Sequence, residues 1–169
     1  MLTTIGWIIS YKVGISGLKY QFKKEEYYKI KEAFSNINDL FLKFFEYVYE
    51  FINISRNLYT TSGDFTEYEL SVFSANKMLK LNYIFNLINI EFPEISFNKD
   101  TILMNSNSID EYYTNLRNIN DVKNVEKFIE FTTEVSNIIH TLWLQTNDLS
   151  IQMNNVIQKR FEKYNLNKK

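Results

Sequence analysis

The chain has 169 residues, no cysteine, four glycines, one proline and a formal net charge of -1. Its length suits one domain with a substantial buried core, and its hydrophobic content of 45% argues against a disordered chain. The lack of cysteine excludes disulfides, thiolate metal sites and thiol nucleophiles. The near-neutral charge disfavours a nucleic-acid-binding protein, because such proteins are usually strongly basic.

Charge is unevenly placed along the chain. Residues 1–31 contain six lysines and two glutamates, and residues 159–169 contain five basic residues and one glutamate. Residues 32–158 contain eight basic and 17 acidic residues. Both ends are therefore basic, which affects the surface potential rather than the fold. The abundance of residues with AT-rich codons indicates a bacterium, a phage or a mobile element as the source.

Residues 1–18 form an apolar segment whose only charged side chain is Lys12. The segment is shorter and more polar than the roughly 20 apolar residues that a membrane-spanning helix needs, and it lacks the features of a secretory signal. We expect it to pack on the rest of the protein, with contact to a membrane or a frayed end as the alternatives. The residues that would make this contact are Leu2, Ile5, Trp7 and Ile9.

The clearest helix is predicted over residues 21–58. Apolar residues recur there at alternating spacings of three and four, which is the a/d pattern of heptads. This pattern serves a dimeric coiled coil and the core of a bundle equally, but further apolar residues widen the stripe and favour a multi-helix core. The residues of the stripe are Tyr27, Ile30, Phe34, Ile37, Phe41, Phe44, Val48 and Phe51.

A second helix is predicted over residues 66–91. Thr66 and Glu69 have the spacing of a capping box, in which each side chain accepts a hydrogen bond from the backbone of the other residue. Pro93 ends the helix, because the residue before a proline is pushed out of the α conformation.

The second half of the chain is predicted to contain one short and one long helix. Residues 92–107 are expected to form a loop, and a second capping box at Ser108 predicts a short helix over residues 109–118. Asp121 is the expected N-cap of a long helix over residues 121–165. The inward-facing residues of this helix include Ile129, Val135, Ile139, Leu142, Leu149, Met153 and Phe161.

These elements predict an all-α protein, an elongated antiparallel helical bundle with two long helices. The bundle is expected to be one domain over residues 19–169, preceded by the apolar segment at residues 1–18. The heptad stripes must bury against one another, because long apolar stripes facing water are unfavourable.

No catalytic motif, metal-binding motif or cofactor-binding motif is found, so no cofactor is expected. The single histidine, His140, lies in an apolar run, which favours a hydrogen-bonded core residue over a catalytic base or a metal ligand. Several glutamates repeat at a spacing of four and share a helix face, which favours a solvated acidic surface over a cation site. These glutamates are Glu46, Glu50, Glu126, Glu130 and Glu134.

The charge pattern suggests a basic pole. If the last helix runs antiparallel to the helix over residues 21–58, its basic end lies beside the start of that helix. An apolar segment next to a cationic cluster suits an anionic membrane surface. The residues of this basic pole are Lys19, Lys23, Lys24, Lys159, Arg160 and Lys163.

The sequence therefore predicts a non-enzymatic helical interaction or scaffold protein of the cytoplasm, which binds a protein partner or self-associates. One alternative is a membrane-associated protein on the cytoplasmic face of the cell membrane, docked through the apolar segment and the basic pole. A second alternative is a helical toxin or enzyme with an unrecognised site. That alternative requires a concave pocket with His140 or the glutamates in its wall.

Overall fold

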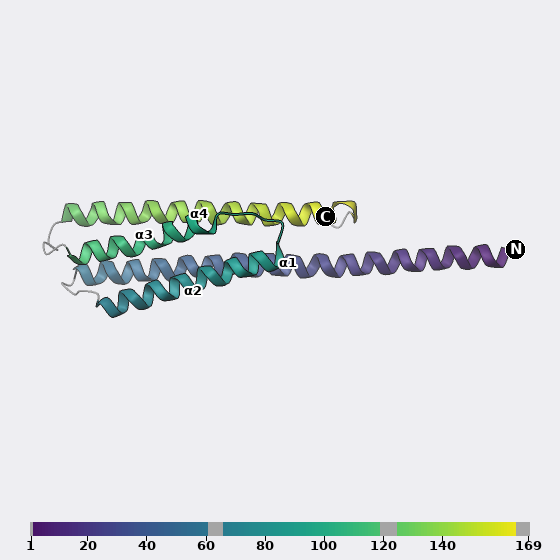
Figure 1. Ribbon diagram of the computed structural model, residues 1–169, viewed down its shortest axis with the longest axis horizontal. Helices are drawn as coiled ribbons and strands as arrows, with labels where there is room; N and C mark the ends of the chain where they lie inside the picture. The colour runs from purple at the N-terminus through teal and green to yellow at the C-terminus, as the bar shows by residue number, and fades with distance from the viewer. Residues whose placement is uncertain (1, 61–65, 119–124, 165–169) are drawn as a thin grey trace.

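The computed structural model describes residues 2–60, 66–118 and 125–164, and the side chains of residues 11–54, 66–114, 129–162 and 164. Figure 1 shows the helices that these residues form. They are α1 (Leu2–Thr60), α2 (Glu67–Glu91), α3 (Lys99–Asn118) and α4 (Val125–Phe161), followed by a short 3-10 helix, η1 (Glu162–Tyr164).

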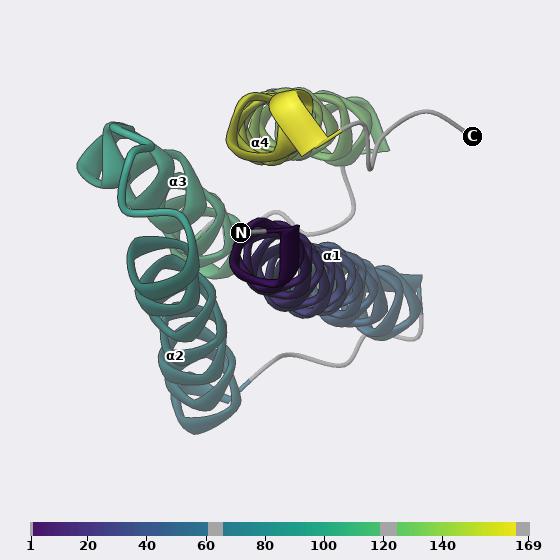
Figure 2. The same cartoon turned by 90° about the vertical axis from the view of Figure 1, so that its right-hand side faces the viewer.

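The helices form an antiparallel bundle, as predicted. Each one runs in the direction opposite to the helix before it, so α4 is antiparallel to α1 (Figure 1). α1 packs on α2 and α4, and α3 packs on the same two helices. Seen end-on, α2 and α3 lie together on one side of the pair formed by α1 and α4 (Figure 2). The predicted all-α fold class is confirmed.

The predicted heptad stripe of α1 forms its side of the core. Seven of its eight residues are buried, and Phe34 is half-buried. Near the end of α1, Phe51 stacks on Phe73 of α2, with ring centroids 3.6 Å apart, and meets the edge of Tyr113 of α3. Tyr113 in turn meets Phe131 of α4 at 5.2 Å. One cluster of aromatic rings therefore links all four helices, and each such pair adds about 0.5–1.5 kcal/mol beyond burial.

α1 differs from the prediction at its start. It begins at Leu2 and continues unbroken through residues 18 and 21, which gives one helix of 59 residues. At about 1.5 Å per residue the rod is on the order of 90 Å long. The expected packing of residues 1–18 on the bundle is wrong for the described side chains, because those of Tyr11, Val13 and Leu18 are exposed.

α2 begins as the capping box predicts. The Glu69 backbone N–H donates to Thr66 Oγ1 at 3.2 Å, and the Thr66 backbone N–H donates to Glu69 Oε2 at 2.8 Å. The last turn closes when the Phe92 N–H donates to the carbonyl of Ile88, one residue before Pro93.

α3 begins about ten residues earlier than predicted. The helix starts at Lys99, so most of the expected loop over residues 92–107 is helical. The Thr101 N–H donates to Asn98 Oδ1 at 3.1 Å, which satisfies an amide of the first turn. The capping box expected at Ser108 is wrong, because Ser108 lies inside the helix and its hydroxyl donates to the Met104 carbonyl.

The early start of α3 has a packing reason. Ile102, Ser106, Ile109 and Tyr113 are buried at spacings of four, three and four. This is the same heptad stripe that marks α1, but one of its positions is a serine. The pattern of apolar residues alone therefore breaks off at Ser106, although the helix does not.

α4 is described from Val125, so the proposed N-cap at Asp121 lies outside the described residues. Two of its residues face differently from the prediction. The Ile129 side chain is exposed rather than inward, and His140 is exposed rather than in the core. The buried stripe begins at Phe131 and passes through Ile139, which turns Ile129 and His140 towards solvent.

Candidate functional site

The N-terminal part of α1 extends beyond the rest of the bundle (Figure 1). Tyr27 is the first residue of α1 in the core, and its ring meets the edge of Phe161 of α4, with centroids 5.3 Å apart. Phe161 is the last residue of α4 and lies beside Tyr27, so the part of α1 that precedes Tyr27 extends beyond the end of α4. We call residues 2–22 of α1 the projection.

The projection carries apolar side chains that face solvent in several directions. At roughly 100° per residue, Tyr11, Leu18 and Phe22 share one side of the helix, whereas Val13 and Tyr20 lie on the opposite side. All five are between 46% and 69% exposed. A helix that is apolar all round is typically covered by protein or lipid. The side chains of the predicted contact residues Leu2, Ile5, Trp7 and Ile9 lie outside the described part of the chain.

Within the part of the chain that the structure describes, no helix is both long and apolar enough to cross a bilayer.

The antiparallel order of α1 and α4 brings the ends of the basic pole together. Lys19 and Lys24 at the base of the projection are exposed, as is Lys159 near the end of α4. Lys23 forms an ion pair with Glu26, and the hydrogen bond that Lys23 donates to this glutamate raises the pKa of Lys23. The side chain of Lys163 is not among those described.

Arg160, the remaining member of the basic pole, holds α4 to the connection between α2 and α3. Its Nε donates to Glu94 Oε1 at 2.8 Å, its guanidinium also bonds the second Glu94 oxygen, and Nη2 donates to the Glu91 carbonyl. The hydrogen bonds from Arg160 lower the pKa of Glu94. The guanidinium also lies over the ring of Phe92, 5.9 Å from its centroid. Arg160 therefore has an intramolecular role, and the exposed cations of the described pole are Lys19, Lys24 and Lys159.

A second surface feature is an open groove between α1 and α4 with a volume of about 880 Å³, which we call the α1–α4 groove. Leu42, Tyr49 and Ile54 of α1 and Trp143 of α4 line it, and all four are about half exposed. No described residue of α2 or α3 lines the groove, and these two helices lie on one side of the α1–α4 pair (Figure 2).

The α1–α4 groove also contains three of the polar residues that the sequence singled out. Glu46 and Glu50 lie in the α1 wall and His140 in the α4 wall, where its ring stacks near Trp143 with centroids 6.1 Å apart. Among the described residues, no group of three or more His, Asp or Glu side chains is arranged to hold a metal ion. The groove is thus an apolar trough with an acidic edge.

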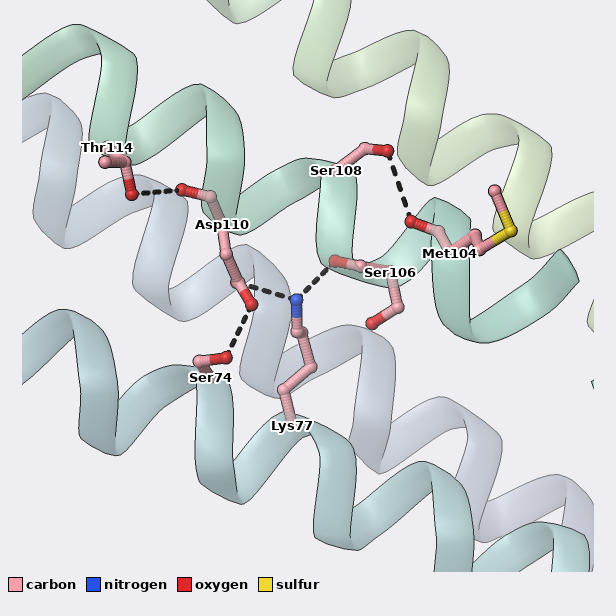
Figure 3. A network of polar contacts seen from close by, with 7 residues as sticks. All are labelled: Ser74, Lys77, Met104, Ser106, Ser108, Asp110 and Thr114. Atoms are coloured by element: carbon pink, nitrogen blue, oxygen red, sulfur yellow. Dashed lines mark hydrogen bonds and ion pairs between the residues drawn. The ribbon is translucent and has the colours of Figure 1, made fainter. Parts of the chain in front are cut away.

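One polar cluster was not predicted from the sequence. Lys77 of α2 is fully buried and forms an ion pair with Asp110 of α3, with Nζ 2.7 Å from Oδ1. Its ammonium also donates to the Ser106 carbonyl, and the Ser74 hydroxyl donates to Asp110 Oδ2 at 2.6 Å (Figure 3). Burial lowers the pKa of Lys77, although Asp110 opposes this effect. A lysine at an inward heptad position is the sequence signal that identifies such a cluster.

Two surfaces are therefore candidates for function. One is the projection with the exposed lysines at its base, and the other is the α1–α4 groove. The buried Lys77 cluster joins α2 to α3 and is closed to solvent at its lysine. Comparison of this chain with protein-family models, with curated proteins and with solved structures gave no match.

Proposed function

We propose that the protein is a non-enzymatic helical scaffold that docks on an anionic membrane surface through the projection. The observation that carries this proposal is a helix with solvent-exposed apolar side chains on opposite sides, reaching past the end of its bundle. The bundle is then held near the membrane, with its other surfaces accessible to protein partners.

The apolar side chains supply most of the expected driving force. Burial of a Val or Leu side chain is worth about 1.5–3 kcal/mol, so Val13 and Leu18 together offer roughly 3–6 kcal/mol before the cost of immobilising the protein. Tyr11 and Tyr20 add amphipathic rings of the kind that favour the membrane interface.

The exposed lysines make this docking selective for anionic lipids. Each basic residue near an anionic surface adds about 1 kcal/mol. Lys19 and Lys24 lie at the base of the projection, and Lys159 lies at the end of α4 that flanks this base. Residues 2–18 are about 25 Å long as a helix, which is shorter than a hydrocarbon core of about 30 Å. The projection therefore inserts with Lys19 and Lys24 at the level of the headgroups and without crossing the bilayer.

Co-sedimentation with vesicles tests the proposal. The full chain should pellet with phosphatidylcholine–phosphatidylserine vesicles and much less with pure phosphatidylcholine vesicles, and deletion of residues 2–18 should abolish pelleting. Lys19→Gln with Lys24→Gln should weaken binding about 30-fold, from about 2 kcal/mol of lost attraction. The matched control, Lys43→Gln with Lys80→Gln, removes two exposed lysines from the body of the bundle and should leave binding nearly unchanged. Equal pelleting of the full chain and the deletion variant would refute the proposal.

A further inference from the structure

When no membrane is present, the exposed apolar side chains of the projection face water, which is unfavourable. Five of its described apolar side chains are 46–69% exposed, and clustered exposed apolar residues commonly mark a surface that binds protein or lipid. The α1–α4 groove is an apolar surface of the opposite shape, concave where the projection is convex. Both surfaces occur on every copy of the chain.

The two surfaces match in length. The α1 wall of the groove runs from Leu42 to Ile54, which is about 18 Å along a helix. The described apolar side chains of the projection run from Tyr11 to Phe22, which is about 17 Å. Because the projection has apolar side chains on opposite sides, it can turn one of them to the groove and keep the other side outward.

The two surfaces also match in charge. Glu46 and Glu50 give the groove an acidic edge, whereas the projection contains Lys12 and Lys19 and no acidic residue. Opposite charges on facing surfaces favour association and fix the orientation of the partners.

The continuity of α1 fixes how two copies would fit. The projection and the α1 wall of the groove belong to one straight rod, with centres separated by roughly 47 Å along it. When two such rods lie antiparallel, with a two-fold axis near residue 32, each projection lies on the groove of the other copy. Both contacts then form at once in a closed, symmetric dimer, whereas a parallel pair forms neither.

We infer that, away from membranes, the protein is an antiparallel dimer in which the projection of each copy occupies the α1–α4 groove of the other. This inference rests on the proposed function, because it describes how the membrane-docking element is covered before it meets lipid. Anionic vesicles then compete with the groove for the projection, so membrane binding and dimerisation exclude each other.

Site-specific cross-linking tests the arrangement. The natural chain has no cysteine, so each introduced cysteine is the only thiol that can react. We would prepare one protein with Val13→Cys in the projection and another with Asn53→Cys in the groove wall, mix them without lipid and add a short bismaleimide. The dimer should give a product that joins position 13 to position 53. Products that join 13 to 13 should be rare, because these positions lie more than about 50 Å apart in the antiparallel pair.

Charge reversal in the groove provides the second arm. Glu46→Lys with Glu50→Lys should convert the lipid-free protein from dimer to monomer by light scattering, with an unchanged circular dichroism spectrum. The same variant should bind anionic vesicles at least as tightly as the natural chain, because its projection is no longer covered. Anionic vesicles should also suppress the 13–53 product of the natural groove.

Three results would overturn the inference. They are a monomeric natural chain by light scattering, a cross-link that joins 13 to 13, and a dimer that survives charge reversal. None of these results affects vesicle binding by the projection, which the co-sedimentation experiment measures separately. Loss of vesicle binding with an intact 13–53 cross-link would instead refute the proposed function and leave the dimer in place.

Discussion

The buried pair of Lys77 and Asp110 should make a large contribution to how α2 and α3 fit together. Lys77 has no exposed side-chain surface, and the Asp110 side chain is 18% exposed. In the variant Lys77→Ala, the carboxylate of Asp110 keeps its hydrogen bond from Ser74 but loses the ammonium, and the Ser106 carbonyl loses its donor. The variant therefore leaves a largely buried charge without its counter-ion.

The loss in free energy of unfolding that is expected for Lys77→Ala can be worked out in two ways. Removal of one partner of a buried ion pair costs about 3–5 kcal/mol. The two hydrogen bonds made by the Lys77 ammonium are charge-assisted, and each is worth about 1.5–3 kcal/mol, which gives a similar range. Because the Asp110 side chain retains some contact with water, we expect Lys77→Ala to lower the free energy of unfolding by about 3 kcal/mol.

Urea unfolding followed by circular dichroism at 222 nm measures this loss. The double variant Lys77→Met with Asp110→Leu should be nearly as stable as the natural chain, because an apolar pair of similar volume removes both charges together. A loss below about 1 kcal/mol for Lys77→Ala would show that the pair is not buried as described.

The pH dependence of stability gives an independent check on Lys77. Its pKa is lowered in the folded protein, so the unfolded chain binds more protons between that lowered value and the ordinary value of 10.5. The free energy of unfolding should therefore rise with pH in this window, and Lys77→Met should remove that rise. A slope that is identical in the natural chain and in the variant would contradict the assignment.

Four further substitutions test other parts of the structure. Thr66→Ala removes the capping box of α2 and should lower the free energy of unfolding by about 1 kcal/mol in urea titrations. Ser106→Ala should leave stability unchanged or raise it, because the buried Ser106 hydroxyl has no hydrogen-bond partner among the described residues. The ion pair of Glu94 with Arg160 should contribute stability above about pH 4.5 that is lost as the pH falls through the lowered pKa of Glu94; Glu94→Gln should remove this dependence at a cost below about 1 kcal/mol. His140→Ala should not weaken vesicle binding in co-sedimentation, because His140 lies in the groove and not on the projection.

The sequence was most informative where apolar spacing and capping residues agreed. The stripe from Tyr27 to Phe51 and the capping box at Thr66 are both seen in the structure. The start of α3 could not be read in the same way, because Ser106 occupies one of its buried positions and interrupts the apolar pattern. Lys77 was missed for a similar reason, since a buried lysine depends on Asp110, which lies 33 residues away in the chain.

The sequence identified the residues of the candidate site, but it did not identify the contacts that these residues make. The basic pole was predicted on the condition that α1 and α4 are antiparallel. The structure meets this condition, because the end of α4, where Phe161 meets Tyr27, lies beside the base of the projection. The pairing of Arg160 with Glu94 could not be predicted, because it depends on the path of the α2–α3 connection. His140 is exposed, contrary to the prediction, although the residue before it, Ile139, is buried. Neighbouring residues on a helix point about 100° apart, so the apolar run around His140 did not show which of its residues face the core.

The central claim is that the projection enters the membrane interface, and the fluorescence of Trp7 tests it most directly. The chain has two tryptophans, Trp7 in the projection and Trp143 in the groove, so Trp143→Phe leaves Trp7 as the only indole. Titration of this variant with phosphatidylserine-containing vesicles should shift the Trp7 emission to shorter wavelength, and brominated lipids should quench it. Emission that neither shifts nor is quenched at saturating lipid would contradict the account.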